Sequence, residues 1–509
     1  MRTRVWLVVL LAMAVVFGGV VGASAKDFVV GIEAEPTSLD PFNTTDGVSL
    51  TVQQTMFEGL VTFGPDGRII PMLAEEFYFN DDATQITFEL RKGVKFHDGT
   101  ELTSFVVKQN FDFVRRKENG MARSNFFSFI DEIVVDGKYN VTFKSNEPNS
   151  AMAAKFAHRS AKVKSAKQIQ KKVDNSDYNL DRDPVGTGPF KFKEWESGQK
   201  VVVVPFEDYW DEERKAKVDR MVFKPVQEAS TRINMLKTGE VHFVYPLPTM
   251  DADNLRNAQN IEVFTAPTVD VFYIGMNLQR DKYSKKVRHA MNHAINKDQL
   301  IAQVLDGYGR VADSPIAPSV YGYFPQAVYE YDKAKAQQLL MEAGYPDGLE
   351  ATLWARNNTE FISVAEFVAI QLEEIGIDVE VQAYETGTLF DMLDNNKGTD
   401  LWVGRWGPGT GEADYGMRPN FASDRVPPNW NNSGFYINKE VDELLDKALS
   451  SPDQELRLTY YQKLQQIIYD DAPWIFLYVP DRVAAKRTEV KGVYIYRDGS
   501  IHINEAEFK

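Results

Sequence analysis

Cysteine is absent from this chain of 509 residues, and its absence excludes several kinds of chemistry. No disulfide can form, and no thiolate can act as a nucleophile or as a metal ligand. No lipid-modified cysteine can anchor the chain behind an export signal. A chain of this length is long enough to bury a large core without disulfides. We therefore expect two or three domains that are held together by packing alone.

Basic residues are fewer than acidic ones, with 57 Lys and Arg against 73 Asp and Glu and a formal charge of −16. This balance argues against nucleic acid as a partner and against binding to an anionic membrane surface.

Catalytic motifs are also missing. The sequence has no Gly-x-Ser-x-Gly elbow, no His-Glu-x-x-His helix and no phosphate-binding loop. His289 and His293 have the spacing of two zinc ligands on a helix, but the acid of a catalytic zinc helix is missing. We expect no metal site, no cofactor and no enzymatic activity, with a secreted hydrolase as a distant alternative.

Long apolar runs are likewise rare, and the run that suggests a function lies at the N-terminus. Arg2 and Arg4 precede an apolar run from Val5 to Val21, and Ala23-Ser24-Ala25 then offers a signal peptidase site. We expect residues 1–25 to be a signal peptide that is cleaved after Ala25, which takes the formal charge from −16 to −18 by the loss of two arginines. The mature protein is then expected in a Gram-negative periplasm, not membrane-spanning and monomeric.

Hydrophobic periodicity predicts α/β architecture. Apolar runs or alternation typical of strands occur at 28–32, 85–90, 132–135, 140–144, 200–205, 221–225 and 271–276. From residue 286 onward, helical patterns at 286–295, 297–307, 333–343 and 363–375 alternate with strands at 351–355 and 379–383. Helices at 440–449 and 454–470 precede a last strand at 474–479. This alternation favours a mostly parallel sheet in the second half of the chain.

Seven short motifs, in this order along the chain, carry a resemblance to a known family. They are Glu35-Pro36-Thr37-Ser38-Leu39-Asp40-Pro41, Phe57-Glu58-Gly59-Leu60, residues 90–100, residues 184–190, residues 235–240, Val287-Arg288-His289-Ala290 and Ala343-Gly344-Tyr345-Pro346. Together they are similar to the extracytoplasmic solute-binding proteins of peptide and nickel ABC importers, family 5.

The resemblance implies a periplasmic-binding-protein-like fold of type II, with two lobes, a hinge and an extra inserted domain. Domain I is expected to comprise residues 26–65, 188–275 and 478–509, domain II residues 66–187, and domain III residues 276–477. The chain would then cross between the lobes near 276 and 478. Closure of such lobes around a ligand is a hinge motion that the ligand favours by binding the closed form better.

The densest polar and aromatic cluster lies at residues 405–419, directly after an apolar strand at 400–403. We therefore expect a loop at the carboxyl end of that strand. Open α/β sheets bind their ligands at this end. Candidate ligand-binding residues in the cluster are Arg405, Trp406, Thr410, Glu412 and Asp414. Peptide-binding members of the family carry an Asp three residues after this Trp, which pairs with the α-amine of the peptide. Gly409 occupies that position here.

The pattern Trp-x-x-x-Thr-Gly-Glu-Ala-Asp-aromatic resembles the glutathione-binding branch of the family. Glutathione has two carboxylates and one amine, so its cleft needs cationic forks and at least one acid. Arg356, with Arg405 or Arg418, is expected to bind the carboxylates, and Glu412 or Asp414 the amine. The alternative for Asp414 is an ion pair with Arg418, four residues later.

Three further candidates lie elsewhere in the chain. Tyr245 and Tyr273 end predicted strands near the expected hinge, where aromatic walls can cover a ligand, although ordinary buried tyrosines would give the same pattern. Arg159 is a candidate because some nickel-chelate binders of the family hold a carboxylate with an arginine near this position.

The sequence thus predicts a substrate-binding protein that captures a small peptide-like ligand, such as glutathione or a related di- or oligopeptide, in a cleft between two lobes. It would deliver the ligand to the transmembrane permease subunits of an ABC importer. A binder of a nickel chelate or of haem on the same scaffold is the alternative.

Overall fold

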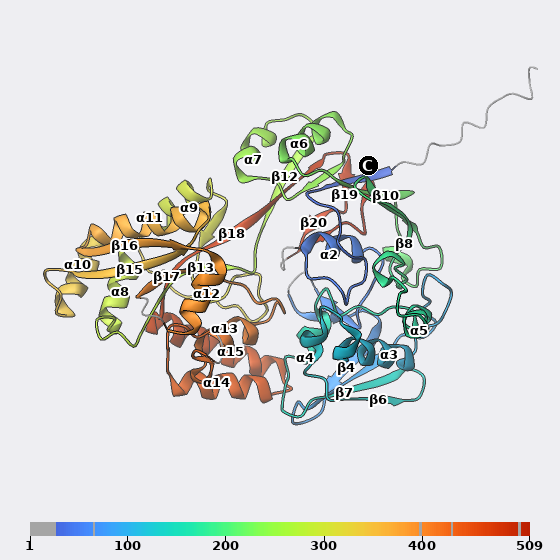
Figure 1. Cartoon of the computed structure of the whole chain (residues 1–509), viewed down its shortest axis with the longest axis horizontal. Helices are drawn as coiled ribbons and strands as arrows, with labels where there is room; N and C mark the ends of the chain where they lie inside the picture. The colour runs from blue at the N-terminus through green and yellow to red at the C-terminus, as the bar shows by residue number, and fades with distance from the viewer. Residues whose placement is uncertain (1–26, 65–66, 397–399, 429–430, 497–499) are drawn as a thin grey trace, which may run out of the picture.

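The computed structural model describes residues 27–64, 67–396, 400–428, 431–496 and 500–509, which form two lobes joined by strands (Figure 1). The expected signal peptide, residues 1–25, lies outside the described residues. Among the described helices, none combines the length and the apolar character needed to cross a membrane.

The first lobe is built on a mixed sheet in which β1 pairs in parallel with β10 and β11, and β9 and β8 continue antiparallel. Phe28, Val30 and Ile32 alternate along β1 toward one core, as a period of two requires. The elements of this lobe are β1 (Asp27–Ile32), α2 (Gly47–Gln53), β8 (Phe190–Glu196), β9 (Lys200–Pro205), β10 (Arg220–Pro225), α6 (Ala229–Thr238), β11 (Phe243–Tyr245), α7 (Thr249–Arg256), β12 (Ile261–Pro267), β19 (Val490–Lys491), β20 (Tyr494–Ile495), β21 (Ile501–His502) and β22 (Glu507–Phe508).

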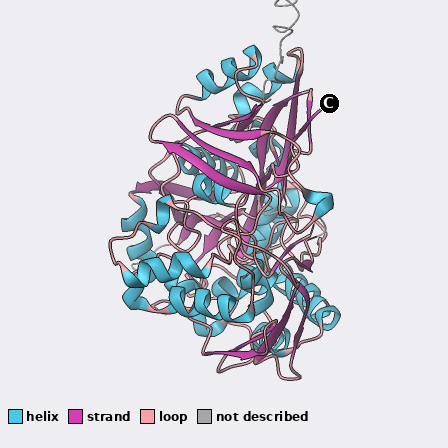
Figure 2. Cartoon of the chain, turned by 90° about the vertical axis from the view of Figure 1, so that its right-hand side faces the viewer, coloured by secondary structure: helices cyan, strands magenta, loops and turns pink. Residues whose placement is uncertain are grey.

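An inserted domain has its own four-stranded sheet, in the order β4-β5-β7-β6, and its own core, which includes Phe88, Phe111, Phe143 and Phe156. In the view of Figure 2 this small sheet lies at the bottom, apart from the first-lobe sheet at the top. Its elements are β2 (Val61–Phe63), β3 (Ile69–Pro71), β4 (Ala74–Phe79), β5 (Gln85–Leu90), α3 (Ser104–Arg115), β6 (Glu132–Asp136), β7 (Asn140–Lys144), α4 (Met152–Ala157) and α5 (Ala166–Asp174).

The second lobe contains most of the helices. Its sheet is mixed rather than mostly parallel, because β15 runs parallel to β16 and β17 whereas β13 is antiparallel to β17 and β18. Its elements are β13 (Val271–Met276), α8 (Lys285–Ala294), α9 (Lys297–Val304), β14 (Gly309–Val311), α10 (Lys333–Glu342), β15 (Leu349–Arg356), α11 (Thr359–Glu373), β16 (Ile377–Tyr384), α12 (Thr386–Asp394), β17 (Leu401–Trp406), α13 (Ala413–Phe421), α14 (Lys439–Ser450) and α15 (Gln454–Asp471).

One long strand, β18 (Trp474–Arg487), belongs to both lobes. Its first half pairs with β13, and its second half pairs with β12 and β11. Because β13 lies in the second-lobe sheet, the boundary that was expected at 275 falls between Pro267 and Val271. We propose this shifted limit for domains I and III, and a start at residue 60 instead of 66 for the inserted domain, because Leu60 and Val61 belong to its core.

The two lobes also touch at the end of the cleft away from β18, where the inserted domain meets α14 and α15 (Figure 1). The backbone N–H of Ser150 donates to the carbonyl of Leu449 at 2.8 Å, and its hydroxyl donates to the carbonyl of Ala448 at 2.9 Å. The carbonyl of Ser150 accepts from Nη1 of Arg457 at 3.4 Å. Every polar group of this buried serine is thus bonded to the second lobe.

Several predicted elements are confirmed with the same bounds, among them β5, β7, β9 and β13.

The cluster at 405–419 is different from the expected loop. Arg405 and Trp406 still belong to β17, and α13 begins at Ala413. The physical reason is the side chain of Glu412, which accepts a hydrogen bond from the backbone N–H of Asp414 and so caps the helix.

Candidate functional site

Two aromatic rings form the floor of a cavity in the second lobe, and each lies against a glycine on the neighbouring strand. In the pairing of β13 with β17, Tyr273 faces Gly404 and Gly275 faces Trp402. A Cβ at Gly404 would lie 2.3 Å from the Tyr273 ring, and a Cβ at Gly275 would lie 2.2 Å from the Trp402 ring. Only glycine leaves room for both rings to lie on the sheet.

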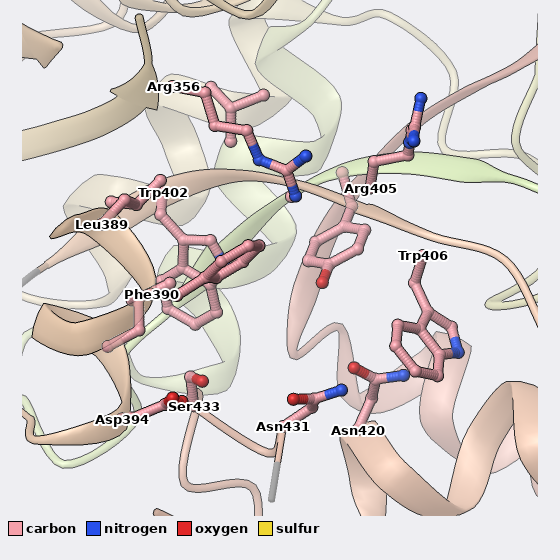
Figure 3. A pocket seen from close by; sticks show the side chains of 14 residues that line it. Arg356, Leu389, Phe390, Asp394, Trp402, Arg405, Trp406, Asn420, Asn431 and Ser433 are labelled. Atoms are coloured by element: carbon pink, nitrogen blue, oxygen red, sulfur yellow. The ribbon is translucent and has the colours of Figure 1, made fainter. Parts of the chain in front are cut away.

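This cavity has a volume of about 450 Å³ and lies between β17, β15, α12 and the segment after α13 (Figure 3). Four expected residues line it, namely Tyr273, Arg356, Arg405 and Trp406. Its other polar and aromatic lining residues are Phe390, Asp394, Trp402, Asn420, Asn431 and Ser433. The mixture of rings, amides and single charges is typical of a small-molecule site.

Arg356, the last residue of β15, is held in the cavity wall by two rings. Its guanidinium carbon lies 4.5 Å from the centroid of Phe361 and 4.9 Å from that of Phe390. Its Nε is buried without a hydrogen-bond partner among the described residues. Burial lowers its pKa, and so does the positive charge of Arg405. The charge of Glu360 acts in the opposite direction on this pKa, but no acid among the described residues forms an ion pair with Arg356. The structure therefore presents a fixed cationic fork without an ion-paired carboxylate.

Arg405 and Trp406 extend the site along β17. No described residue forms an ion pair or hydrogen bond with the Arg405 side chain, which extends away from Trp402 and Asp394 in Figure 3. The indole Nε1 of Trp406 donates to the carbonyl of Tyr415 at 3.3 Å, and the two rings lie 5.7 Å apart. This contact fixes Trp406 against the start of α13.

The first lobe has a cavity of its own, of about 300 Å³, next to the hinge. Arg159, Tyr245 and Arg482 line it, together with Glu33 and Asp46. Arg482 lies on the half of β18 that pairs with β12, and its charge also reaches Glu360 in the second lobe. The charges of Arg405 and Arg356, which line the second-lobe cavity, act on the same carboxyl group, so cationic residues from both cavities lie around Glu360.

The acids that were expected to bind an amine already have partners. Asp414 is buried and forms an ion pair with Arg418 at 3.0 Å, so the alternative role considered for it is confirmed. Glu412 is fully buried and bonded to Arg457 and Tyr461. Burial raises the pKa of Glu412, and Arg457 counteracts this. The expected amine-binding role is therefore withdrawn for both residues.

Thr410 lies outside the main cavity. It is buried, and together with Tyr415 it lines a separate cavity of about 360 Å³ between the second lobe and Lys155 of the inserted domain. The two histidines that have the spacing of zinc ligands each contact a backbone carbonyl. His289 contacts the carbonyl of Asp470, and His293 contacts the carbonyl of Glu330. Within the described residues, no group of three or more His, Cys, Asp or Glu side chains could hold a metal ion.

Several lining residues were missed in the sequence, above all Phe390 and Asp394 on α12 and Trp402 on β17. The apolar spacing of Leu389, Phe390 and Leu393 is a helical signal that could have located α12. The face of the sheet on which Trp402 lies depends on the register of β17 with β13. Hydrophobic periodicity alone does not give this register.

Comparison with known proteins agrees with this architecture. The family model described as bacterial extracellular solute-binding proteins, family 5, middle, matches residues 68–427, which is more than half of the chain. The glutathione-binding protein GsiB of Pectobacterium atrosepticum is 34% identical over 512 residues, which cover 99% of this chain and 98% of the relative.

Solved structures show the same fold. HbpA2 from Haemophilus parasuis has a TM-score of 0.89 at 24% identity, covering 95% of this chain and 100% of that one. The periplasmic binding protein DppA from Helicobacter pylori, in complex with the peptide STSA, has a TM-score of 0.70 at 28% identity, covering 94% and 98%. The chain therefore belongs to family 5 of the bacterial extracellular solute-binding proteins and has their type II two-lobed fold.

Proposed function

We propose that this protein captures a small peptide with more than one carboxylate, with glutathione as the best candidate, and delivers it to the permease subunits of an ABC importer. The relative from Pectobacterium atrosepticum supports glutathione, because its similarity spans nearly the whole of both chains. The DppA complex with the peptide STSA supports the wider class of peptide ligands.

The observation that carries this proposal is Arg356. Its guanidinium is clamped between two rings and has no carboxylate partner among the described residues. A guanidinium held in this way binds a carboxylate through two parallel hydrogen bonds. Arg405, whose side chain is also unpaired within the described residues, offers a second cation for the second carboxylate of glutathione.

The first-lobe cavity supplies the opposite wall. Closure of the two lobes brings Arg159 and Tyr245 toward the ligand on the second lobe, while Arg482 lies on the connecting strand β18 itself. A ligand that contacts both walls binds the closed form better than the open one, and so shifts the population toward closure. Trp406, next to Arg405, contributes a ring to the rim of this site.

The route to the site of action belongs to the same proposal. We infer export through the segment 1–25 with cleavage after Ala25, followed by action as a periplasmic monomer. Mass spectrometry of the protein from the periplasmic fraction tests the cleavage site directly. An intact N-terminus at Met1 would contradict it.

Calorimetric titration tests the ligand. The purified mature protein is titrated with reduced glutathione, oxidised glutathione, a set of dipeptides and a nickel–histidine chelate. Binding of a glutathione form, and its loss in Arg356→Ala with an unchanged melting curve, are the expected results. Binding of dipeptides or of the chelate alone would keep the family and refute glutathione.

A further inference from the structure

Asp394 lines the cavity from the side opposite Arg356 (Figure 3). It is the last residue of α12, and among the described residues that line the cavity it is the only acid. No described residue forms a hydrogen bond or an ion pair with its carboxylate. The rings of Trp402 and Phe390 lie between the two charged groups in the view of Figure 3.

The position of this carboxylate is electrostatically unfavourable in the protein alone. The carboxyl end of a helix carries a partial negative charge, which favours cations over acids. Asp391 lies one turn earlier, and the last turn of α12 contains no basic residue. Asp394 is an exposed residue, but partial desolvation and the charge of Asp391 both raise the pKa of its carboxyl group. A positively charged group of a bound ligand would stabilise the ionised carboxylate of Asp394.

The helix that carries Asp394 is held firmly against the sheet. Leu389 and Leu393 pack on Trp354 and Trp402 in one buried cluster. The cap residue Asn395 donates from Nδ2 to Oδ1 of Asp391 at 2.9 Å, so Asp391 has a structural partner whereas Asp394 has none among the described residues. The carboxylate of Asp394 is therefore presented to the cavity by a rigid element.

A cavity with a cation at one end, an acid at the other and rings between them is complementary to a ligand that carries both charges. Glutathione has a free α-amine on its γ-glutamyl residue. The acids near residue 412 are unavailable for this amine, because Glu412 and Asp414 are bonded to Arg457 and Arg418.

We propose that Asp394 is the specificity-determining residue that binds the free α-amine of the γ-glutamyl group, while Arg356 binds a carboxylate of the same ligand. This inference rests on the proposed function and names the group that completes it. It also explains how a chain with Gly409 in place of an acid recognises an amine.

The experiment compares reduced glutathione with glutaryl-cysteinyl-glycine, which has the same carboxylates but lacks the amine. We expect the wild-type protein to bind glutathione about tenfold more tightly or better, since a charge-assisted bond is lost with the amine. Asp394→Asn should lower the affinity for glutathione to that of the analogue and leave the binding of the analogue nearly unchanged. Asp391→Asn, on the same helix but outside the cavity lining, is the matched control and should keep the wild-type preference.

The outcomes separate this inference from the proposed function. A wild-type protein that binds neither compound overturns both. A wild-type protein that prefers glutathione, together with Asp394→Asn that keeps this preference, overturns the role of Asp394 alone. Loss of both ligands in Asp394→Asn also overturns it, because the analogue has no amine for this carboxylate to bind.

Discussion

The ring of Tyr273 rests on the bare backbone of Gly404, its partner across β13 and β17. The ring also stacks on Trp474, with the centroids 3.5 Å apart and the planes 6° from parallel, which restricts its movement. The floor of the second-lobe cavity depends on this glycine having no side chain.

Gly404→Ala is expected to weaken ligand binding about tenfold and to lower the free energy of unfolding by about 1–3 kcal/mol, the usual cost of overpacking. The new Cβ would lie 2.3 Å from the ring, which must then tilt into the cavity. Calorimetric titration and urea unfolding measure the two effects. Gly409→Ala is the control, because nothing lies within 4 Å of a Cβ at that position. Equal affinities of the two variants would refute the role of the ring floor.

Arg356→Lys tests whether shape matters beyond charge. Lysine keeps the positive charge but loses the planar fork and its stacking between Phe361 and Phe390. We expect the affinity for a carboxylate ligand to fall about tenfold or more, with the loss mainly in the dissociation rate. Arg256→Lys, on the exposed face of α7, should leave the affinity unchanged. A lysine variant with wild-type affinity would show that the site needs only a point charge.

Glu412→Gln should destabilise the fold, because it leaves the guanidinium of Arg457 buried without its counter-charge. Breaking a buried pair of this kind typically costs about 3–5 kcal/mol. Urea unfolding of this variant is compared with that of Glu455→Gln, whose side chain is exposed on α15. If Glu412 instead bound ligand, the variant would lose affinity and keep its stability, which is the opposite pattern.

Acid should destabilise the protein through His97. Nδ1 accepts a hydrogen bond from the N–H of Gly186, and Nε2 lies 3.0 Å from the carbonyl of Gly188, to which it donates, so the ring is neutral. Burial lowers the pKa of His97 to about 4. The unfolded chain, with a pKa of about 6.5, binds this proton first, so stability falls as the pH falls from 6.5 to 4.

Replacement of His97 by Gln should remove about 2–3 kcal/mol of this pH dependence, as measured by urea unfolding across that range. Parallel curves for the wild-type protein and His97→Gln would contradict the assignment, because carboxylates titrating in the same range would then account for the whole slope.

Local patterns predicted the elements of this fold well, since period and turn chemistry are local properties. The strands at 140–144 and 200–205 have the predicted bounds, and Gly344 and Gly376 adopt the positive φ angles expected beyond a helix end. The helix at 413–421 has no clear helical pattern in the sequence, because Gly416 and Pro419 interrupt that pattern and the cap by Glu412 depends on a side-chain bond.

The candidate site was only partly predictable. Arg356, Arg405 and Trp406 lie at strand ends and Tyr273 lies within β13, and these four predicted residues line one cavity. The ion-pair partner of Glu412 could not be predicted from the sequence, because tertiary packing brings Arg457 to it. For Asp414 the sequence left the ion pair with Arg418 as one of two alternatives. Asp394 has no motif around it, and its significance appears only when the cavity places it opposite Arg356.

Ser150 gives the molecule a second fixed point between its lobes. β18 holds one end of the cleft, and the three bonds of Ser150 to α14 and α15 hold the other. A rigid body attached at two separate points keeps a single rotation, about the line that joins them. While both attachments persist, the two lobes can approach each other along one arc only, so Arg356 and Arg159 keep one fixed register relative to each other during that motion.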